Sequence, residues 1–480
     1  MNRLGPIDAA FISLETSRTP MNIGALLTFK LPPRAPHDYL RALFATLREQ
    51  AVTTPPFNYK LAQKRLSRLA PAWETVSNLD IDYHLRHSSL PWPGGERELG
   101  VLVARLHSNA IDLARPPWEM HLIEGLERRR FAIYFKAHHA AWDGIGALGM
   151  VKTWLSQHPD ARNAIAPWAL SKQAESKGKE VEQMRSVLRR TLEMTGDQLR
   201  SAGELVRTLR RMSNREENPE GGAYSALETP RTPFNVPITP QRRLATQLYE
   251  LSRFKAIGDA TGASINDICL VICAGAVRRY LRDLGQLPDK PLVASMPVGL
   301  ARPDGKAGNA VAGLVCPLPT MHDDLLRGLG DVAAVTRRGK EHLRSMSPSA
   351  LQQFTLLGLS PLILGQMTGL AAKAPPFFNF VVSNVVASKH RLYFNGAELE
   401  AMYPISVLFD GYALNVTVVG YADRLSIGFT GCRDALPSLQ RLAVYTGEAL
   451  AQLERAALPT SGKSRAKPDT SSSRSPTARG

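Results

Sequence analysis

Apolar residues recur along residues 1–160 with the two spacings that regular secondary structure produces. Short apolar runs over residues 24–29 and 131–136 are typical of strands. Residues 38–51 and 98–111 instead carry apolar side chains three and four positions apart, which predicts helices with one buried face. The alternation of the two patterns predicts a lobe that combines helices with a sheet.

Residues 243–458 repeat this alternation. Ser264 and the Asn266-Asp267 pair precede an apolar helical pattern and are suited to cap its N-terminus. Further strand-like runs lie at residues 291–297, 378–383, 414–420 and 425–430. Two alternating halves predict a two-lobed protein of the α/β (α+β) class.

The segment between the halves, residues 161–242, differs in composition. Residues 180–212 have a helical pattern with many arginines, and proline and glycine accumulate after them. We expect a connector with a basic amphipathic helix, which either is a solvated surface helix or lies on an anionic or lipid surface. Residues 459–480 are rich in Ser, Thr, Pro, Lys and Arg, which predicts a disordered basic tail.

Residues 345–372 carry no charge and are strongly apolar in places. A membrane-spanning helix needs about 20 consecutive apolar residues. Glutamines, glycines, serines and Pro361 interrupt the run, so we expect buried helices or an apolar surface that touches lipid. The N-terminus lacks the apolar core of a signal peptide.

The formal net charge is +16, and this basic excess suits nucleic acid, an anionic membrane or a phosphate-rich ligand. No nucleic-acid-binding motif is evident, so nucleic acid is the weakest of these. The four cysteines form neither a disulfide framework nor a zinc-binding set with histidine. We expect buried free thiols and no metal; the cysteines are Cys269, Cys273, Cys316 and Cys432.

The segment with the clearest chemical potential is residues 138–144, His-His-Ala-Ala-Trp-Asp-Gly, between a predicted strand and a predicted helix. A neutral histidine can take a proton from a hydroxyl group near neutral pH, which makes His139 a candidate general base. Asp143 can shape the loop, for instance by pairing with an arginine. Metal binding by His138, His139 and Asp143 is disfavoured, because adjacent histidines in a strand point to opposite faces. A histidine satisfied by backbone groups in a tight turn is the remaining alternative.

This segment resembles the active-site motif of the bacterial wax ester synthase/diacylglycerol acyltransferase family. Further blocks resemble that family's other signatures in the same order, so the likeness extends from about residue 4 to residue 455. Pro117 and the Val-Ala-Ser run at residues 386–388 depart from the family pattern. The other blocks are residues 14–16, 20–24, 113–119, 264–267, 380–385 and 408–411.

The resemblance implies the fold of chloramphenicol acetyltransferase-like, CoA-dependent acyltransferases, with an active-site tunnel between two similar lobes. It also implies transfer of an acyl group from acyl-CoA to a long-chain alcohol or diacylglycerol, with His139 as base and no acyl-enzyme. In this scheme acyl-CoA is a co-substrate and no further cofactor is needed. We expect a cytoplasmic protein associated peripherally with the inner membrane or with lipid inclusions.

The resemblance also ranks the other candidate residues. His138 supports the site, and Asp143 with Gly144 shapes the loop. Asn266 and Asp267 either orient the site or only cap a helix. Asn384 and Asp410 lie in blocks that resemble family blocks. Ordinary packing explains their presence as easily as a role in the site.

Two rival functions remain open. An acyltransferase of the same fold can act on another hydroxylated acceptor or on an acyl group carried by a protein-bound arm. A non-catalytic protein can keep the fold and bind lipid inclusions. The spacing of His139 and Asp143 favours an enzyme over the second rival.

Overall fold

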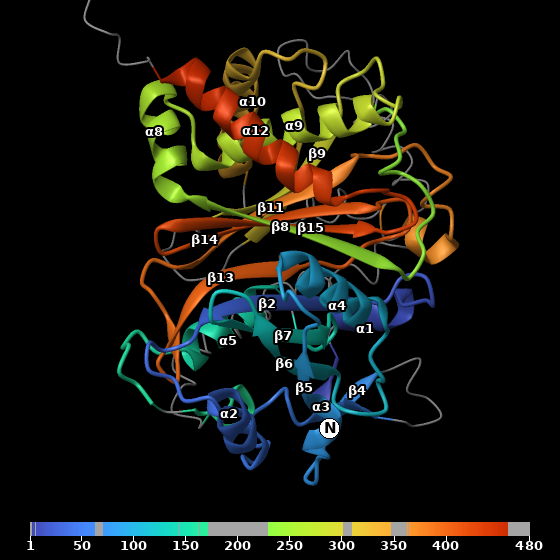
Figure 1. The fold of residues 1–480 in the computed structure, drawn as a ribbon. Helices are drawn as coiled ribbons and strands as arrows, with labels where there is room; N and C mark the ends of the chain where they lie inside the picture. The colour runs from blue at the N-terminus through green and yellow to red at the C-terminus, as the bar shows by residue number, and fades with distance from the viewer. Residues whose placement is uncertain are drawn as a thin grey trace, which may run out of the picture.

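In the computed structural model, two six-stranded sheets lie one above the other, with helices packed against them (Figure 1). This confirms the predicted α/β (α+β) class and the two lobes. The structure describes residues 2–4, 6–62, 71–142, 144–162, 164–170, 229–300, 310–346, 362 and 364–458. The predicted basic helix over residues 180–212, the predicted tail and much of the apolar stretch over residues 345–372 lie outside this part of the chain.

The first sheet has the strand order β12-β13-β2-β7-β6-β5. Its strands are β2 (Asn22–Lys30), β5 (Leu85–Ser89), β6 (Trp118–Leu126), β7 (Arg130–His138), β12 (Tyr393–Phe394) and β13 (Ala397–Ile405). The accompanying helices are α1 (Pro6–Leu14), α2 (Tyr39–Arg48), α3 (Ile81–His84), α4 (Glu96–Ser108), α5 (Gly144–Trp154) and the 3-10 helix Pro167–Ala169. A small sheet of β1 (Asn2–Arg3), β4 (Ala72–Thr75) and β3 (Tyr59–Leu61) completes this lobe.

The second sheet has the order β10-β9-β11-β14-β15-β8, and β11 pairs in parallel with both β9 and β14. Its strands are β8 (Arg242–Glu250), β9 (Val293–Leu300), β10 (Ala310–Pro317), β11 (Phe380–Ser388), β14 (Leu414–Tyr421) and β15 (Arg424–Cys432). The helices that cover it are α8 (Leu251–Thr261), α9 (Ile265–Asp283), α10 (Leu325–Ser345) and α12 (Gln440–Ala457) (Figure 1).

β13 comes from the second half of the chain but belongs to the first sheet. It pairs antiparallel with β2, from Glu398 opposite Lys30 to Ile405 opposite Gly24. The boundary predicted at residue 243 assigns all of residues 243–458 to the second lobe, so sheet membership departs from that division at β12 and β13. Hydrophobic pattern reports burial and not the partner strand, which is why the exchange was not predicted.

The lobes meet where β13 crosses β15 and where α4 packs on β8. At the crossing, a Cβ atom on Gly428 would lie 2.7 Å from the Pro404 carbonyl oxygen, so only glycine lets the strands approach this closely. Arg242 is buried at the same boundary, and its backbone N–H donates to the Ser108 hydroxyl at 2.8 Å. Burial lowers the pKa of Arg242 to about 10.

Among the described helices, none is by itself long and apolar enough to cross a membrane. Helices α8 and α9 pass that test only when they are taken together, by length and composition, and the angle between them is 103°. Residues 268–274 of α9 are all buried in the core of the second lobe, which explains its apolar character.

All four cysteines are free and buried, as the sequence predicts. Burial raises the pKa of Cys273 and of Cys316 to about 12. Reaction with a disulfide reagent requires an accessible thiolate. We therefore expect Ellman's reagent to modify the native protein slowly and to reach four thiols per chain only in denaturant. Rapid modification of one native cysteine would contradict this burial.

Candidate active site

β7 carries the candidate motif to the end of the first sheet. The chain turns directly after the strand, because the His138 carbonyl oxygen accepts the N–H groups of Ala141 and Trp142 at 3.0 and 3.2 Å. The His138 N–H donates to the Pro117 carbonyl oxygen at 3.0 Å, and the His139 N–H donates to the Met21 carbonyl oxygen at 2.7 Å. Strands on both sides of β7 therefore fix the backbone of the two histidines.

The two histidine side chains occupy different environments. His138 is fully buried, whereas His139 is partly exposed. The His139 ring stacks on Phe11 of α1, with ring centroids 3.9 Å apart and planes 16° from parallel. This contact fixes the plane of the imidazole and leaves part of its surface accessible, as a general base requires.

Glu15, which follows α1, holds both histidines. One carboxylate oxygen accepts the Met21 N–H at 3.1 Å, and the Met21 carbonyl in turn holds the backbone of His139. The other oxygen lies 3.5 Å from His138 Nε2. This second contact lacks hydrogen-bond geometry, so we treat it as electrostatic. Glu15 thus links the N-terminal segment to the motif through one carboxylate.

The tautomer of neutral His138 follows from its contacts. Its Nδ1 atom accepts the Ala140 N–H at 3.1 Å, so the ring proton of the neutral form is on Nε2. The Nε2 atom that carries this proton lies 3.5 Å from the Glu15 carboxylate. His138 is therefore committed to the turn and to Glu15, which agrees with a supporting role.

Charged groups are also buried on the α4 side of the sheet. Lys136 is fully buried, and its ammonium donates to the Leu106 carbonyl oxygen at 3.0 Å and lies 3.8 Å from Glu119. Burial lowers the pKa of Lys136, although Glu119 opposes the shift. Burial acts to raise the pKa of Glu119, but His121 and Lys136 bring it below its usual value. Lys136 lies two residues before His138 on β7, and Glu119 lies on the neighbouring strand β6.

The loop after the histidines is only partly described. Asp143 lies outside the described residues, so its predicted role in shaping the loop stays a prediction. Gly144 begins α5 and is exposed. A Cβ atom there would meet no atom within 4 Å among the described residues, so packing does not explain this glycine.

Asn266 and Asp267 differ in environment although they are adjacent. Asp267 is buried and accepts hydrogen bonds from the Ser264 backbone and hydroxyl at 2.9 and 2.6 Å. Its other oxygen accepts the Thr336 hydroxyl at 2.6 Å and so ties α9 to α10. Asn266 is exposed and accepts a hydrogen bond from the Asn384 amide on β11, a strand that contacts α5. The structure thus brings Asn266 and Asn384 together and gives Asp267 a capping position.

Asp410 is buried in the loop before β14. One oxygen accepts the Ile238 N–H at 2.9 Å, and the other lies 3.5 Å from the Arg18 guanidinium. Arg18 belongs to the first lobe, so Asp410 forms an ion pair between the lobes. This contact supports a packing role for Asp410.

A cluster of hydroxyl and amide groups near the motif was not predicted. Thr417 on β14 contacts the Ser383, Ser406 and Asn415 side chains, each at 3.0 Å. Ser406 follows β13 directly, and β2 alone separates β13 from β7 in the sheet order. Neighbouring strands are about 4.8 Å apart, which places Ser406 roughly 10 Å from the end of β7. Ser383 lies in a sequence block that resembles the family, but its partner Thr417 follows only from the pairing of β11 with β14.

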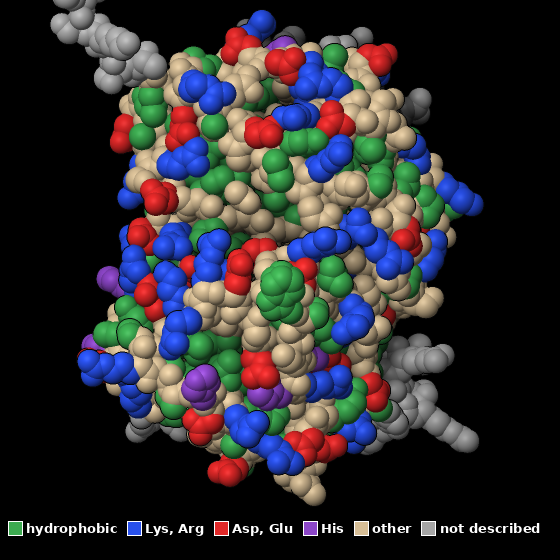
Figure 2. Space-filling view, viewed as in Figure 1, with side chains coloured by type: hydrophobic (Ala, Val, Ile, Leu, Met, Phe, Trp, Pro, Cys, Tyr) green, Lys and Arg blue, Asp and Glu red, His purple; other side chains and the backbone are tan. Residues whose placement is uncertain are grey.

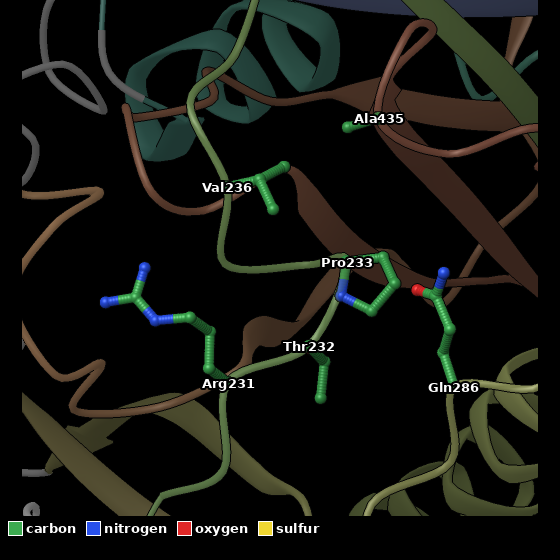
Figure 3. Close-up of a pocket in the computed structure, with 6 residues that line it drawn as sticks. All are labelled: Arg231, Thr232, Pro233, Val236, Gln286 and Ala435. Atoms are coloured by element: carbon green, nitrogen blue, oxygen red, sulfur yellow. The ribbon is translucent and has the colours of Figure 1, made fainter.

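A pocket of ≈ 550 Å³ lies in the second lobe, away from the motif, and Figure 3 shows Arg231 pointing away from Gln286 there. The Arg231 guanidinium donates to the carbonyl oxygens of Lys373 and Ala374 at 2.9 and 2.8 Å, so its donors are committed. None of the candidate residues lines this pocket, and we do not assign it to catalysis. Its lining residues are Arg231, Thr232, Pro233, Val236, Gln286 and Ala435. Within the described residues no group of three or more His, Cys, Asp or Glu side chains could hold a metal ion.

Comparison with known proteins gives this site its context. The model of the wax ester synthase/diacylglycerol acyltransferase catalytic domain matches residues 4–269, and the C-terminal domain model of the same group matches residues 307–454. The chain belongs to this acyltransferase family. The family resemblance read from the motifs is thereby confirmed.

Individual relatives agree along nearly the whole chain. A Mycobacterium tuberculosis protein named as a diacylglycerol O-acyltransferase is 44% identical and covers 96% of this chain and 100% of its own. The O-acyltransferase WSD of Acinetobacter baylyi is 32% identical, and the match covers 95% of this chain and 97% of that protein. The wax ester synthase/diacylglycerol acyltransferase structure from Marinobacter aquaeolei has a TM-score of 0.78 at 35% identity, with coverages of 95% and 100%.

A more distant likeness concerns the fold alone. The first condensation domain of the CDA synthetase has a TM-score of 0.55 at 17% identity and covers 95% of this chain and 96% of its own. This agrees with the predicted chloramphenicol acetyltransferase-like arrangement of two lobes.

The contacts of Glu15 generate a first prediction. Glu15→Gln keeps an oxygen for the Met21 N–H but removes the charge beside His138, whereas Glu15→Ala removes both. We expect kcat to fall on the order of 10²-fold for Glu15→Ala, since small misplacements of catalytic groups have effects of this size. The kcat of Glu15→Gln should fall less than that of Glu15→Ala. The KM for acyl-CoA should change little in both variants. Equal kcat in wild type and Glu15→Ala, with unchanged melting temperatures, would remove Glu15 from the positioning of the motif.

The contrast between Asp267 and Asn266 generates a second prediction, which concerns stability. Asp267→Ala leaves the Ser264 and Thr336 groups without their acceptor, so we expect the free energy of unfolding to drop by about 1–3 kcal/mol. Asn266→Ala should change it by less than about 0.5 kcal/mol, as is usual for exposed positions. Urea titration measures both. Turnover per folded molecule should survive Asp267→Ala; loss of turnover without loss of stability would assign Asp267 to the site instead.

Proposed function

We propose that this chain transfers the acyl group of a long-chain acyl-CoA to the hydroxyl of a fatty alcohol or of diacylglycerol, giving wax ester or triacylglycerol. The observation that carries the proposal is the placement of His139 at the end of β7, with one ring face against Phe11 and its backbone held by Met21. The choice of substrates is supported by the names of the Mycobacterium tuberculosis and Marinobacter aquaeolei proteins, which refer to diacylglycerol and wax ester.

His139 acts as the general base. It accepts the proton of the acceptor hydroxyl while the oxygen attacks the thioester carbonyl carbon. The tetrahedral intermediate then collapses, the bond to sulfur breaks, and His139 returns the proton to the CoA sulfur. The reaction needs neither an acyl-enzyme nor a metal, and acyl-CoA is the only co-substrate. Buried cysteines with raised pKa values are poor nucleophiles, which supports this direct transfer.

The lipid substrates and products also favour a cytoplasmic enzyme associated with the surface of the inner membrane or of lipid inclusions. Figure 2 shows Lys and Arg side chains gathered along the boundary between the lobes on one face of the molecule. Such a surface suits both the phosphates of CoA and anionic headgroups. Two alternatives remain: the same chemistry on another hydroxylated acceptor, and a lipid-inclusion-binding protein without activity.

The test is an assay with palmitoyl-CoA and either hexadecanol or a diacylglycerol, in which released CoA thiol and lipid product are followed together. We expect ester from wild type and a loss on the order of 10²–10⁴-fold for His139→Ala, as for removal of a general base. His158→Ala is the matched control, because His158 is an exposed histidine of the same lobe and should keep full activity.

Each other outcome selects an alternative. Ester formation that survives His139→Ala would exclude His139 as the base. If CoA is released only with an acceptor other than these lipids, the mechanism stands and the proposed substrate is wrong. Lipid binding without turnover in any acceptor would favour the inclusion-binding protein.

A further inference from the structure

An exposed tryptophan stands out on the surface of the first lobe. The Trp92 side chain lies in the loop between β5 and α4 and is 92% exposed. Val101, on the exposed side of α4, is 62% exposed. Single exposed apolar residues are common, but a tryptophan exposed to this degree forgoes the burial that its large ring normally gains.

The loop that carries Trp92 is firmly supported. The Leu90 N–H donates to the Glu124 carbonyl oxygen, and the Glu127 N–H donates to the Gly94 carbonyl oxygen, both at 3.0 Å. Gly94 has a φ of +75°, and a Cβ atom there would lie 1.8 Å from the Gly125 carbonyl oxygen, so only glycine fits. The loop is therefore held against the β6–β7 hairpin and presents Trp92 from a fixed base.

The neighbouring hairpin tip presents two arginines in an unfavourable backbone conformation. Arg128 and Arg129 have φ values of +61° and +54° and are exposed. Two consecutive left-handed residues at a hairpin tip favour Asn-Gly, because a Cβ atom is costly there. Arginine at both positions makes the turn less stable than Asn-Gly would. This cost indicates that the two charges have a role other than stabilising the fold.

The loop, the hairpin tip and the start of α4 adjoin one another, since Gly94 bonds Glu127 and Glu96 pairs with Arg130. Their exposed side chains are called the Trp92 patch: Trp92, Arg97, Val101, Arg128 and Arg129. Three acidic groups lie beside it. Glu96 and Glu127 are 2.8 and 3.7 Å from Arg130, Glu127 is also 3.8 Å from Arg128, and Glu98 accepts the Gly95 N–H at 2.9 Å. Together with Arg130, four arginines therefore stand beside three carboxylates, which leaves a small positive excess. Tryptophan beside arginine is the combination found where proteins enter the headgroup region of anionic lipid.

We propose that the Trp92 patch docks this enzyme on an anionic lipid surface, with the indole of Trp92 among the headgroups and Arg97, Arg128 and Arg129 on lipid phosphates. A second copy of the chain is a poor occupant, because it would bring the same positive charges to the contact. The inference rests on the proposed function, which makes lipid both substrate and product. It adds the face by which the protein approaches that lipid.

The backbone conformation allows a test that separates docking from folding. Arg128→Asn/Arg129→Gly removes both charges and supplies the residues that the turn favours, so the melting temperature should rise while lipid binding weakens. Binding of the full chain is measured by sedimentation with phosphatidylglycerol/phosphatidylcholine vesicles at moderate salt. We expect about a tenfold or greater loss for this variant, from two surface charges each contributing to attraction by the anionic layer. Trp92→Ala should also weaken binding, with little effect on stability.

Arg337→Gln/Arg338→Gln on exposed positions of α10 is the matched control, since it removes the same net charge elsewhere. It should bind vesicles nearly as wild type does. A loss as large as that of the hairpin variant would assign binding to net charge alone and overturn the proposal. Unchanged binding by both patch variants would also overturn it, and would turn attention to an acidic protein partner.

Activity on water-soluble substrates separates this inference from the proposed function. Octanoyl-CoA and a short-chain alcohol need no lipid surface, so the patch variants should turn them over at the wild-type rate. If wild type binds vesicles through the patch but makes no ester with any acceptor, the proposed function fails and the docking surface stands. If the enzyme is active and the patch variants bind as wild type, only the docking surface fails.

Discussion

The pairing of β13 with β2 is the constraint on which the rest of the structure depends. It fixes a strand from the second half of the chain in the first sheet, so the segments on either side of β13 tie the second lobe to that sheet. The same strand crosses β15 at Gly428, where two backbones touch. Because β2 also pairs with β7, the histidine motif is held one strand away from this connection. The strand that ties the lobes together and the strand that carries the histidines therefore belong to one sheet, with β2 between them.

Within that frame the motif is held by backbone hydrogen bonds and by side-chain contacts together. Pro117 and Met21 accept the N–H groups of the two histidines, and the Glu15 carboxylate joins Met21 to His138. Phe11 then sets the plane of the His139 ring. A base fixed in this way loses little freedom when substrate arrives, which is the usual advantage of a preorganised site.

Hydrophobic pattern predicted many of these elements well. The strands over residues 24–29 and 131–136 appear as β2 and β7, each longer by a few residues, and the helix over residues 98–111 appears as α4. The motif was placed correctly between a strand and a helix. The exchange of β13, the Glu15 contact and the hydroxyl groups around Thr417 were not predicted, because each depends on which strands become neighbours. Periodicity reports which face of an element is buried and says nothing about that choice.

The central claim is direct transfer from thioester to alcohol with His139 as the base, and intact-protein mass spectrometry tests it most directly. The protein is mixed with palmitoyl-CoA in the absence of any acceptor and quenched within one turnover time. We expect an unmodified protein mass together with intact acyl-CoA. A stable increase equal to one acyl group, located on a cysteine or serine, would contradict it and require a covalent intermediate.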